Sequence, residues 1–301
     1  MNKPPSIAIL TGGTCDEKEI SLLSATNIFE TIKNLDYRVK IFDIRLGLYN
    51  LLPLLLQYTV IFPVLHGFEG EDGKLSYFLE KNKLQFIGPT SSTCHKSWNK
   101  RTFKNICKSL GIKTPDWFIA TRKTINNMPF IYPVIIKPLE NGSSIDVQIV
   151  GNKEDLNNIA TYIFDKYHEV MIESYITGIE VTVGILEKKV LPLIEIQTPN
   201  KELFTYDNKY NGKTKEIPFA PSLLPALQEK IKKIALRIHR ELGFKYLSRT
   251  DFIITKDQIY VLEINSIPGL TNQSLFPKAV EAAGFTFEEA ISQLIHLCSK
   301  K

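Results

Sequence analysis

Long apolar runs and clustered cysteines are both missing from this sequence of 301 residues. No segment approaches the roughly 20 apolar residues that cross a membrane, and the apolar run at residues 7–10 is too short for a secretory leader. The four cysteines show no C-x-x-C spacing and no matching histidine set, which argues against a zinc site. Scattered cysteines are typical of a cytoplasmic protein, and no membrane partner is expected.

The charge balance argues against a nucleic-acid partner. The net charge is +5, and the lysine-rich stretches lie far apart, at residues 100–104, 209–215 and 230–233. Spread charge indicates solvated faces or single phosphate contacts, whereas nucleic-acid-binding proteins gather basic residues in one stripe. The length predicts two or three packed domains.

The first third of the chain alternates between strand and helix patterns. Apolar strands are predicted at residues 7–10, 37–44 and 59–65, and a helix between the first two has apolar residues at helical spacing from Leu22 to Leu35. This alternation predicts a mostly parallel sheet, whose ligands gather at the carboxyl ends of its strands. The turn at Gly12 and Gly13 lacks the G-x-G-x-x-G pattern of dinucleotide sites, so it is interpreted as a structural turn.

Two later polar loops are each open to two interpretations. Residues 66–73 combine a histidine with three glycines and three acidic residues, which suits either a tight loop or a ligand site. Lys137 ends an apolar strand and is followed by residues 141–144, Asn-Gly-Ser-Ser. An ammonium, hydroxyls and backbone amides can all donate to one phosphate, although a plain surface turn has the same composition.

Residues 249–265 predict an antiparallel hairpin with a polar turn at residues 256–258. A three-residue loop with Thr255 opposite Ile259 sets Asp251 opposite Glu263 and Arg249 opposite Asn265. Facing carboxylates need water or a cation, and their oxygens with an Asn carbonyl suit magnesium held together with nucleotide phosphates. The alternative is a hairpin with one solvated face.

Together these motifs resemble the D-alanine–D-alanine ligases of the ATP-grasp superfamily over nearly the whole chain. The resemblance rests on Gly12-Gly13-Thr14 with Glu17-x-Glu19, His66-Gly67-x-x-Gly70-Glu71-Asp72-Gly73, Lys137-Pro138 with Gly142-Ser143-Ser144, Glu173 with Gly178-x-Glu180, Tyr206-x-x-Lys209-Tyr210, Arg249-x-Asp251, and Glu263-x-Asn265-x-x-Pro268-Gly269-x-Thr271. Each motif is weak alone, but seven in the family's order are specific.

The resemblance implies a mixed α/β and α+β fold in three domains. These are an N-terminal parallel-sheet domain that binds substrate (residues 1–92), a central ATP-grasp domain (93–180) and a C-terminal catalytic ATP-grasp domain (181–301). It also implies a cytoplasmic homodimer that joins two D-alanines, using ATP and two Mg²⁺ or Mn²⁺ ions, for peptidoglycan synthesis.

Roles for individual residues follow from the same resemblance. The implied metal ligands are Asp251, Glu263 and Asn265. The implied ATP-binding residues are Lys100, Lys137, Glu173, Tyr175, Ile176, Glu180 and Lys209. Those implied for catalysis are Glu17, Ser143, Tyr210, Arg249 and Gly269, and those for further substrate contacts are His66, Ser274 and Leu275.

Two features of the sequence bear on specificity and activity. Tyr210 resembles the dipeptide-forming members, whereas phenylalanine there marks ligases that accept D-lactate. The loop at residues 142–146, here called the serine loop, has Asp146 where the family usually has glycine, and a charge there could weaken ATP binding. The alternatives are a ligase for another pair, such as D-alanine with D-serine, and a nucleotide-binding protein that has lost catalysis.

Overall fold

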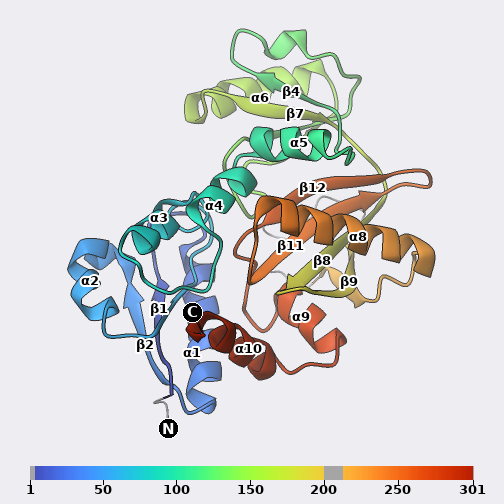
Figure 1. Cartoon of the computed structure of the whole chain (residues 1–301). Coiled ribbons are helices and arrows are strands. Elements are labelled where there is room, and N and C mark those ends of the chain that lie inside the picture. The colour runs from blue at the N-terminus through green and yellow to red at the C-terminus, as the bar shows by residue number, and fades with distance from the viewer. Residues whose placement is uncertain (1–3, 200–212, 301) are drawn as a thin grey trace.

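The strands form three sheets in the computed structural model, which describes residues 4–199 and 213–300. Figure 1 shows the three sheets in separate parts of the molecule: β1 and β2 lie at the left, β4 and β7 at the top, and β8, β9, β11 and β12 at the right. No helix in these described residues is long and apolar enough to cross a membrane.

The N-terminal sheet is parallel, as predicted, with the order β2-β1-β3. Its strands are β1 (Ser6–Thr11), β2 (Arg38–Asp43) and β3 (Val60–Pro63). Between and after them lie α1 (Lys18–Asn34), η1 (Ile44–Leu46), α2 (Leu48–Leu55) and α3 (Lys74–Lys81). Ala25, Ile28 and Ile32 of the predicted helix face are buried, so the helical spacing marked the core side correctly.

Two short helices link the N-terminal sheet to the next sheet. The chain forms α4 (Ser91–Trp98) and α5 (Lys100–Ser109), which are separated by Asn99 in an extended conformation. The Asn99 side chain accepts a hydrogen bond from the Thr102 amide and so caps α5. Lys100 therefore lies in the first turn of a new helix.

The central sheet is antiparallel with the order β4-β7-β5-β6. Its elements are β4 (Trp117–Ala120), η2 (Ile125–Asn127), β5 (Val134–Pro138), β6 (Gln148–Val150), α6 (Lys153–Lys166) and β7 (Val170–Ser174). Apolar residues of α6, such as Leu156 and Ile163, pack on one face of the sheet. Ile135 and Lys137, which alternate with the α6-facing residues of β5, line a cavity on the opposite face.

The third sheet is also antiparallel, with the order β10-β9-β8-β11-β12. Its strands are β8 (Ile179–Leu186), β9 (Lys189–Gln197), β10 (Lys215–Pro218), β11 (Leu247–Ile254) and β12 (Ile259–Asn265). Helix α8 (Pro225–Leu242) covers it through Ile231, Ala235 and Ile238. Strand β8 begins at Ile179, so the third sheet starts beside the predicted boundary at residue 180. The domain limits themselves remain predictions.

The last two helices return to the beginning of the chain. Helices α9 (Leu275–Ala282) and α10 (Phe287–Ser299) join a buried cluster that includes Ile7 and Ile9 of β1 as well as Leu294 and Ile295 of α10. Figure 1 shows α10 lying beside α1. The C-terminal helices therefore fix the N-terminal domain against the third sheet.

Candidate active site

The hairpin of β11 and β12 places four polar side chains at one end of the third sheet. Asp251 lies opposite Glu263, and Arg249 lies opposite Asn265, as predicted. The expected turn is wrong, because Ile254 rather than Thr255 faces Ile259, and a β-bulge between Asp251 and Phe252 restores the predicted pairing beyond it.

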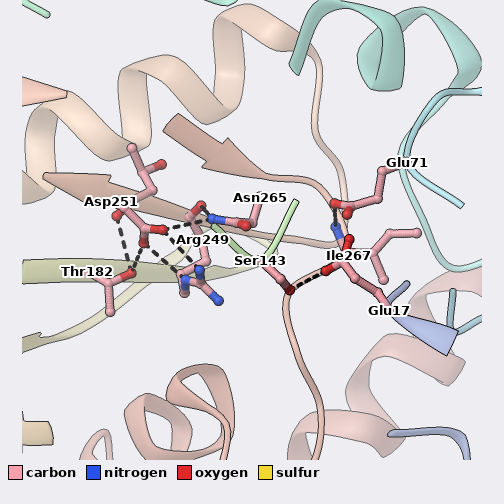
Figure 2. Close-up of polar contacts among 9 residues, drawn as sticks. Glu17, Glu71, Ser143, Thr182, Arg249, Asp251, Asn265 and Ile267 are labelled. Atoms are coloured by element: carbon pink, nitrogen blue, oxygen red, sulfur yellow. Dashed lines mark hydrogen bonds and ion pairs between the residues drawn. The ribbon is translucent and has the colours of Figure 1, made fainter. Parts of the chain in front are cut away.

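The Asp251 carboxylate is held from three sides. Arg249 donates from Nε to Oδ1 at 3.0 Å and from Nη2 to Oδ2 at 2.9 Å. The Asn265 amide donates to Oδ2 at 3.0 Å, and the Thr182 hydroxyl donates to Oδ1 at 2.5 Å (Figure 2). Thr182 was not predicted, although its place two residues after Glu180 on β8 puts both side chains on one face.

Glu17 and Ser143 connect the N-terminal and central domains. Glu17 precedes α1 and is 5% exposed, and the Ser143 hydroxyl donates a hydrogen bond to it (Figure 2). A Cβ on Gly142 would lie 2.5 Å from the Glu17 carboxylate, and one on Gly67 would lie 2.3 Å from it. The two glycines thus let both loops approach Glu17 closely.

His66 is buried beside this pair as a neutral imidazole. Its Nδ1 lies 2.9 Å from the Ile267 carbonyl, which can only accept, so Nδ1 carries the proton. The Ser24 hydroxyl then donates to Nε2 at 3.0 Å. Burial lowers the pKa of His66 to about 4, against the opposing effect of the Ile267 carbonyl. The histidine orients its neighbours without adding charge near neutral pH.

Glu71 is a buried residue to which the sequence assigned no role. Its carboxylate accepts from the Gly67 amide at 3.0 Å, the Ser266 hydroxyl at 2.9 Å and the Ile267 amide at 3.2 Å. Burial, with a smaller contribution from the charge of Glu17, raises the pKa of Glu71 to about 7. Glu71 joins the loop after β3 to the segment after β12.

A first cavity, of about 70 Å³, lies among these groups. It is lined by every residue predicted for catalysis or substrate contact within the described ranges, namely Glu17, His66, Ser143, Arg249, Gly269, Ser274 and Leu275. Tyr210 lies outside the described residues. Glu71 and Glu216 also line the cavity and were not predicted, and Glu216 forms an ion pair with Lys278 of α9.

A second cavity, of about 120 Å³, lies between the central and third sheets. It is lined by all the described residues predicted to bind ATP, namely Lys100, Lys137, Glu173, Tyr175, Ile176 and Glu180. Lys209 lies outside the described residues. Asp251 and Glu263 line the same cavity, so two of the three predicted metal ligands lie with the ATP-binding residues, whereas Asn265 lines the first cavity.

Glu173 lies between two lysines at the buried end of this cavity. Its carboxylate pairs with Lys104 at 2.7 Å and with Lys137 at 2.8 Å, and it is 2% exposed. Burial alone would raise the pKa of Glu173, but the two ammonium groups outweigh it and lower the pKa. The sequence did not identify Lys104, whose only signal is its position four residues after Lys100 on α5.

The donor set of the hairpin fits a hard divalent cation. Asp251 and Glu263 face one another, and the amide of Asn265 lies against Asp251. Within residues 4–199 and 213–300, no three His, Cys, Asp or Glu side chains converge on one point. Two carboxylates and an amide are therefore a partial shell, of the kind that magnesium completes with phosphate oxygens and water.

The central and third sheets are antiparallel, have a cavity lined by lysines and carboxylates between them, and are joined to a parallel-sheet domain. This arrangement defines an ATP-grasp enzyme fold. The family model described as D-ala D-ala ligase C-terminus matches residues 106–296. The chain is 36% identical to the D-alanine–D-alanine ligase of Petrotoga mobilis, covering 96% of both chains. The corresponding protein of Aquifex aeolicus is 35% identical, with 96% of this chain and 99% of that one covered.

Solved structures agree with these relatives. The D-alanine–D-alanine ligase of Bacillus anthracis complexed with ATP superposes with a TM-score of 0.84 at 28% identity, covering 98% of this chain and 97% of that one. A D-Ala:D-Ser ligase of Enterococcus faecalis superposes with a TM-score of 0.82 at 25% identity, covering 98% and 99%. The chain belongs to the D-alanine–D-alanine ligase family.

Proposed function

We propose that this protein joins two D-alanines into D-alanyl-D-alanine at the expense of ATP, for peptidoglycan precursor synthesis. The observation that carries the proposal is the position of the hairpin between the two cavities. Arg249 and Asn265 line the smaller cavity, whereas Asp251 and Glu263 line the larger one. A phosphoryl group held at Asp251 and Glu263 would therefore lie next to an acceptor held beside Arg249.

The reaction proceeds in two bond-forming steps. A carboxylate oxygen of the first D-alanine attacks the γ-phosphorus of ATP, and ADP leaves. The amine of the second D-alanine then attacks the acyl carbon, loses a proton, and phosphate departs as the peptide bond forms. The phosphoryl transfer depends mainly on positioning and charge stabilisation.

Residues around the smaller cavity hold the two amino acids. Glu17 binds the ammonium of the first D-alanine, with neutral His66 beside it. Ser274 and Leu275, at the start of α9, meet the carboxylate of the second. Ser143 keeps Glu17 in place through the hydrogen bond between them, and Tyr210 is proposed to extend this chain of hydrogen bonds.

The acyl carbon develops an oxyanion when the amine attacks it. Arg249 and the Gly269 amide are the proposed donors, and both border the smaller cavity. The guanidinium of Arg249 is already oriented by its two bonds to Asp251. A fixed donor costs little reorganisation when the charge appears.

The larger cavity takes the nucleotide. Lys100, Lys137 and Lys209 contact its phosphates, and the strand-linking segment with Tyr175 and Ile176 encloses the adenine. Glu173 and Glu180 complete the adenine and ribose contacts. Asp251, Glu263 and Asn265 would hold two Mg²⁺ or Mn²⁺ ions, which neutralise phosphate charge.

The direct test is D-alanine-dependent phosphate release from ATP and magnesium, with the product identified by mass and with D-serine and D-lactate as competitors. We expect D-alanyl-D-alanine with one phosphate per dipeptide. A mixed D-alanyl-D-serine product would favour the second candidate, a ligase like the structurally similar D-Ala:D-Ser enzyme. ATP binding without any dependence on a D-amino acid would indicate a protein that has lost catalysis.

We further propose a cytoplasmic homodimer that associates through the N-terminal domain. All four cysteines are free, as in a reducing compartment. Large apolar side chains are exposed around α2, namely Leu46, Tyr49, Leu54 and Leu56, and such a surface is typical of protein interfaces. Sedimentation velocity of the wild type and of a Tyr49→Glu variant tests this: the variant should sediment as a monomer, and an unchanged profile would argue against this surface.

A further inference from the structure

The serine loop has a backbone that requires support. Ser143, Ser144 and Asp146 have φ values of 49°, 58° and 58°. Residues other than glycine seldom adopt this left-handed region, and each such residue is strained unless its surroundings hold it. A loop with three of them keeps its shape only if other groups fix it.

Asp146 supplies such a connection to α6. Its carboxylate accepts from Lys166 at 2.6 Å, from the Tyr167 hydroxyl at 2.6 Å and from the Tyr162 hydroxyl at 2.8 Å. Lys166 and Tyr162 belong to α6, and Tyr167 follows its last residue. Burial would raise the pKa of Asp146, but these donors outweigh it and lower the pKa, so the side chain is ionised.

Tyr167 also holds the other end of the loop. Its hydroxyl oxygen accepts from the Asn141 side-chain amide at 3.2 Å. The backbone carbonyl of Asn141 accepts a hydrogen bond from the Lys100 ammonium at 2.7 Å. One tyrosine therefore joins the residue that precedes the serine loop to the residue that ends it.

The direction of the Asp146 side chain removes the expected conflict with phosphate. Its neighbours Ser144 and Ile145 line the nucleotide cavity, while its own carboxylate is held at α6 and compensated by Lys166. Asp146, which replaces the family's usual glycine, thus holds the loop through contacts with α6 and Tyr167 and not through contacts inside the cavity.

We propose that Asp146 and Tyr167 are positioning residues that hold the serine loop in its phosphate-binding conformation before the nucleotide arrives. The inference rests on the proposed function, because it takes the larger cavity as the ATP site. Preorganisation of this kind strengthens binding by reducing the ordering that the ligand must impose.

The test compares the affinities for ATP and for adenosine, both measured by calorimetry in the absence of D-alanine. Asp146→Asn and Tyr167→Phe should each weaken ATP binding about tenfold, as expected for the loss of a hydrogen bond to a charged group. Adenosine lacks phosphates, so its affinity should stay within about twofold. The double variant should lose less than the two single losses combined, because both changes break one network.

Asp165→Asn is the matched control. Asp165 lies beside Lys166 on α6, but its partner is the exposed Arg122, so ATP affinity should be unchanged. Asp146→Gly is a second variant that removes the network while relieving the positive φ, and it should weaken ATP binding as well.

The possible outcomes separate the inference from the function on which it rests. A wild type that binds ATP no better than adenosine contradicts the proposed phosphate site itself. A wild type that prefers ATP, with variants that keep the same preference, overturns only the positioning role. Equal losses for ATP and adenosine in the variants also overturn it, because they indicate a general structural effect.

Discussion

Arg249 and Asp251 lie two residues apart on β11 and form a two-pronged ion pair, with N–O distances of 3.0 and 2.9 Å. Strand alternation puts both side chains on one face of the sheet. The pair is the boundary between the two cavities, because Arg249 lines the smaller and Asp251 the larger. Proposed oxyanion stabilisation and proposed metal binding are thus coupled through one contact.

Replacing Arg249 with alanine should abolish dipeptide formation and leave the fold intact. Loss of one oxyanion donor typically lowers turnover by about 100-fold or more, whereas Asp251 retains Thr182 and Asn265 as partners. Dipeptide yield by mass, together with circular dichroism, measures both effects. Turnover similar to that of the wild type in a folded variant would remove Arg249 from the mechanism.

Gly142→Ala should impair D-alanine binding more than stability. The new Cβ would lie 2.5 Å from the Glu17 carboxylate, which is the end of a side chain and can be displaced. Because Glu17 is proposed to bind the first D-alanine, the KM for that substrate should rise about tenfold, as for the loss of one charged hydrogen bond. Gly88→Ala, where the nearest atom is 3.5 Å away, is the control and should leave KM unchanged.

Lys104→Met should destabilise the protein through Glu173. Removing one partner of a buried ion pair typically costs about 3 kcal/mol or more in the free energy of unfolding, and Lys104 is fully buried. Denaturant titration should therefore show a large loss, and Lys104→Met combined with Glu173→Gln should recover part of it. The control is Lys108→Met, at an exposed position one turn further along α5, which should change the free energy of unfolding little. If Lys108→Met lowers the free energy of unfolding as much as Lys104→Met does, the buried ion pair is not the cause.

Stability should decrease with rising pH because of Glu71. Its folded-state pKa of about 7 lies above the ordinary value of 4.5, so the folded protein binds the proton more tightly than the unfolded chain. This contribution is fully present below about pH 4.5 and is lost as the pH rises through 7.

The shift in the Glu71 pKa corresponds to a loss in the free energy of unfolding on the order of 3 kcal/mol between pH 4.5 and 8. Glu71→Gln resembles the protonated acid and should not show this decline. The free energy of unfolding of the wild type and of Glu71→Gln should be measured across this pH range. The difference between the two proteins reports on Glu71 alone, because all other groups titrate in both proteins. Parallel pH profiles for the two proteins would contradict the raised pKa.

The sequence predicted the chemistry of the site better than its internal contacts. Alternation along residues 249–265 was enough to put Arg249 with Asp251, and Glu263 with Asn265, on one face of each strand, because side chains on a strand repeat every two residues. The loop was predicted one residue too short, and the β-bulge between Asp251 and Phe252, which leaves no distinct mark in an apolar strand, was not predicted. The error and the bulge offset one another at the functional end of the hairpin.

Buried charges were the hardest feature to predict. Lys104 lies on a helix among other polar residues, where a lysine is normally exposed, and its burial depends on Glu173, which is distant in sequence. Glu71 belongs to a loop that the sequence marked as a turn or a site. Its contact with Ser266 depends on how the N-terminal domain packs against the end of β12.

Helix α10 has a consequence for biosynthesis. The β2-β1-β3 sheet is translated before α10, yet Ile7 and Ile9 of β1 belong to the same buried cluster as Leu294 and Ile295 of α10. While the ribosome is still translating the intervening residues, this sheet must keep an apolar surface uncovered. The N-terminal sheet therefore completes its core only after residues 287–299 have been synthesised.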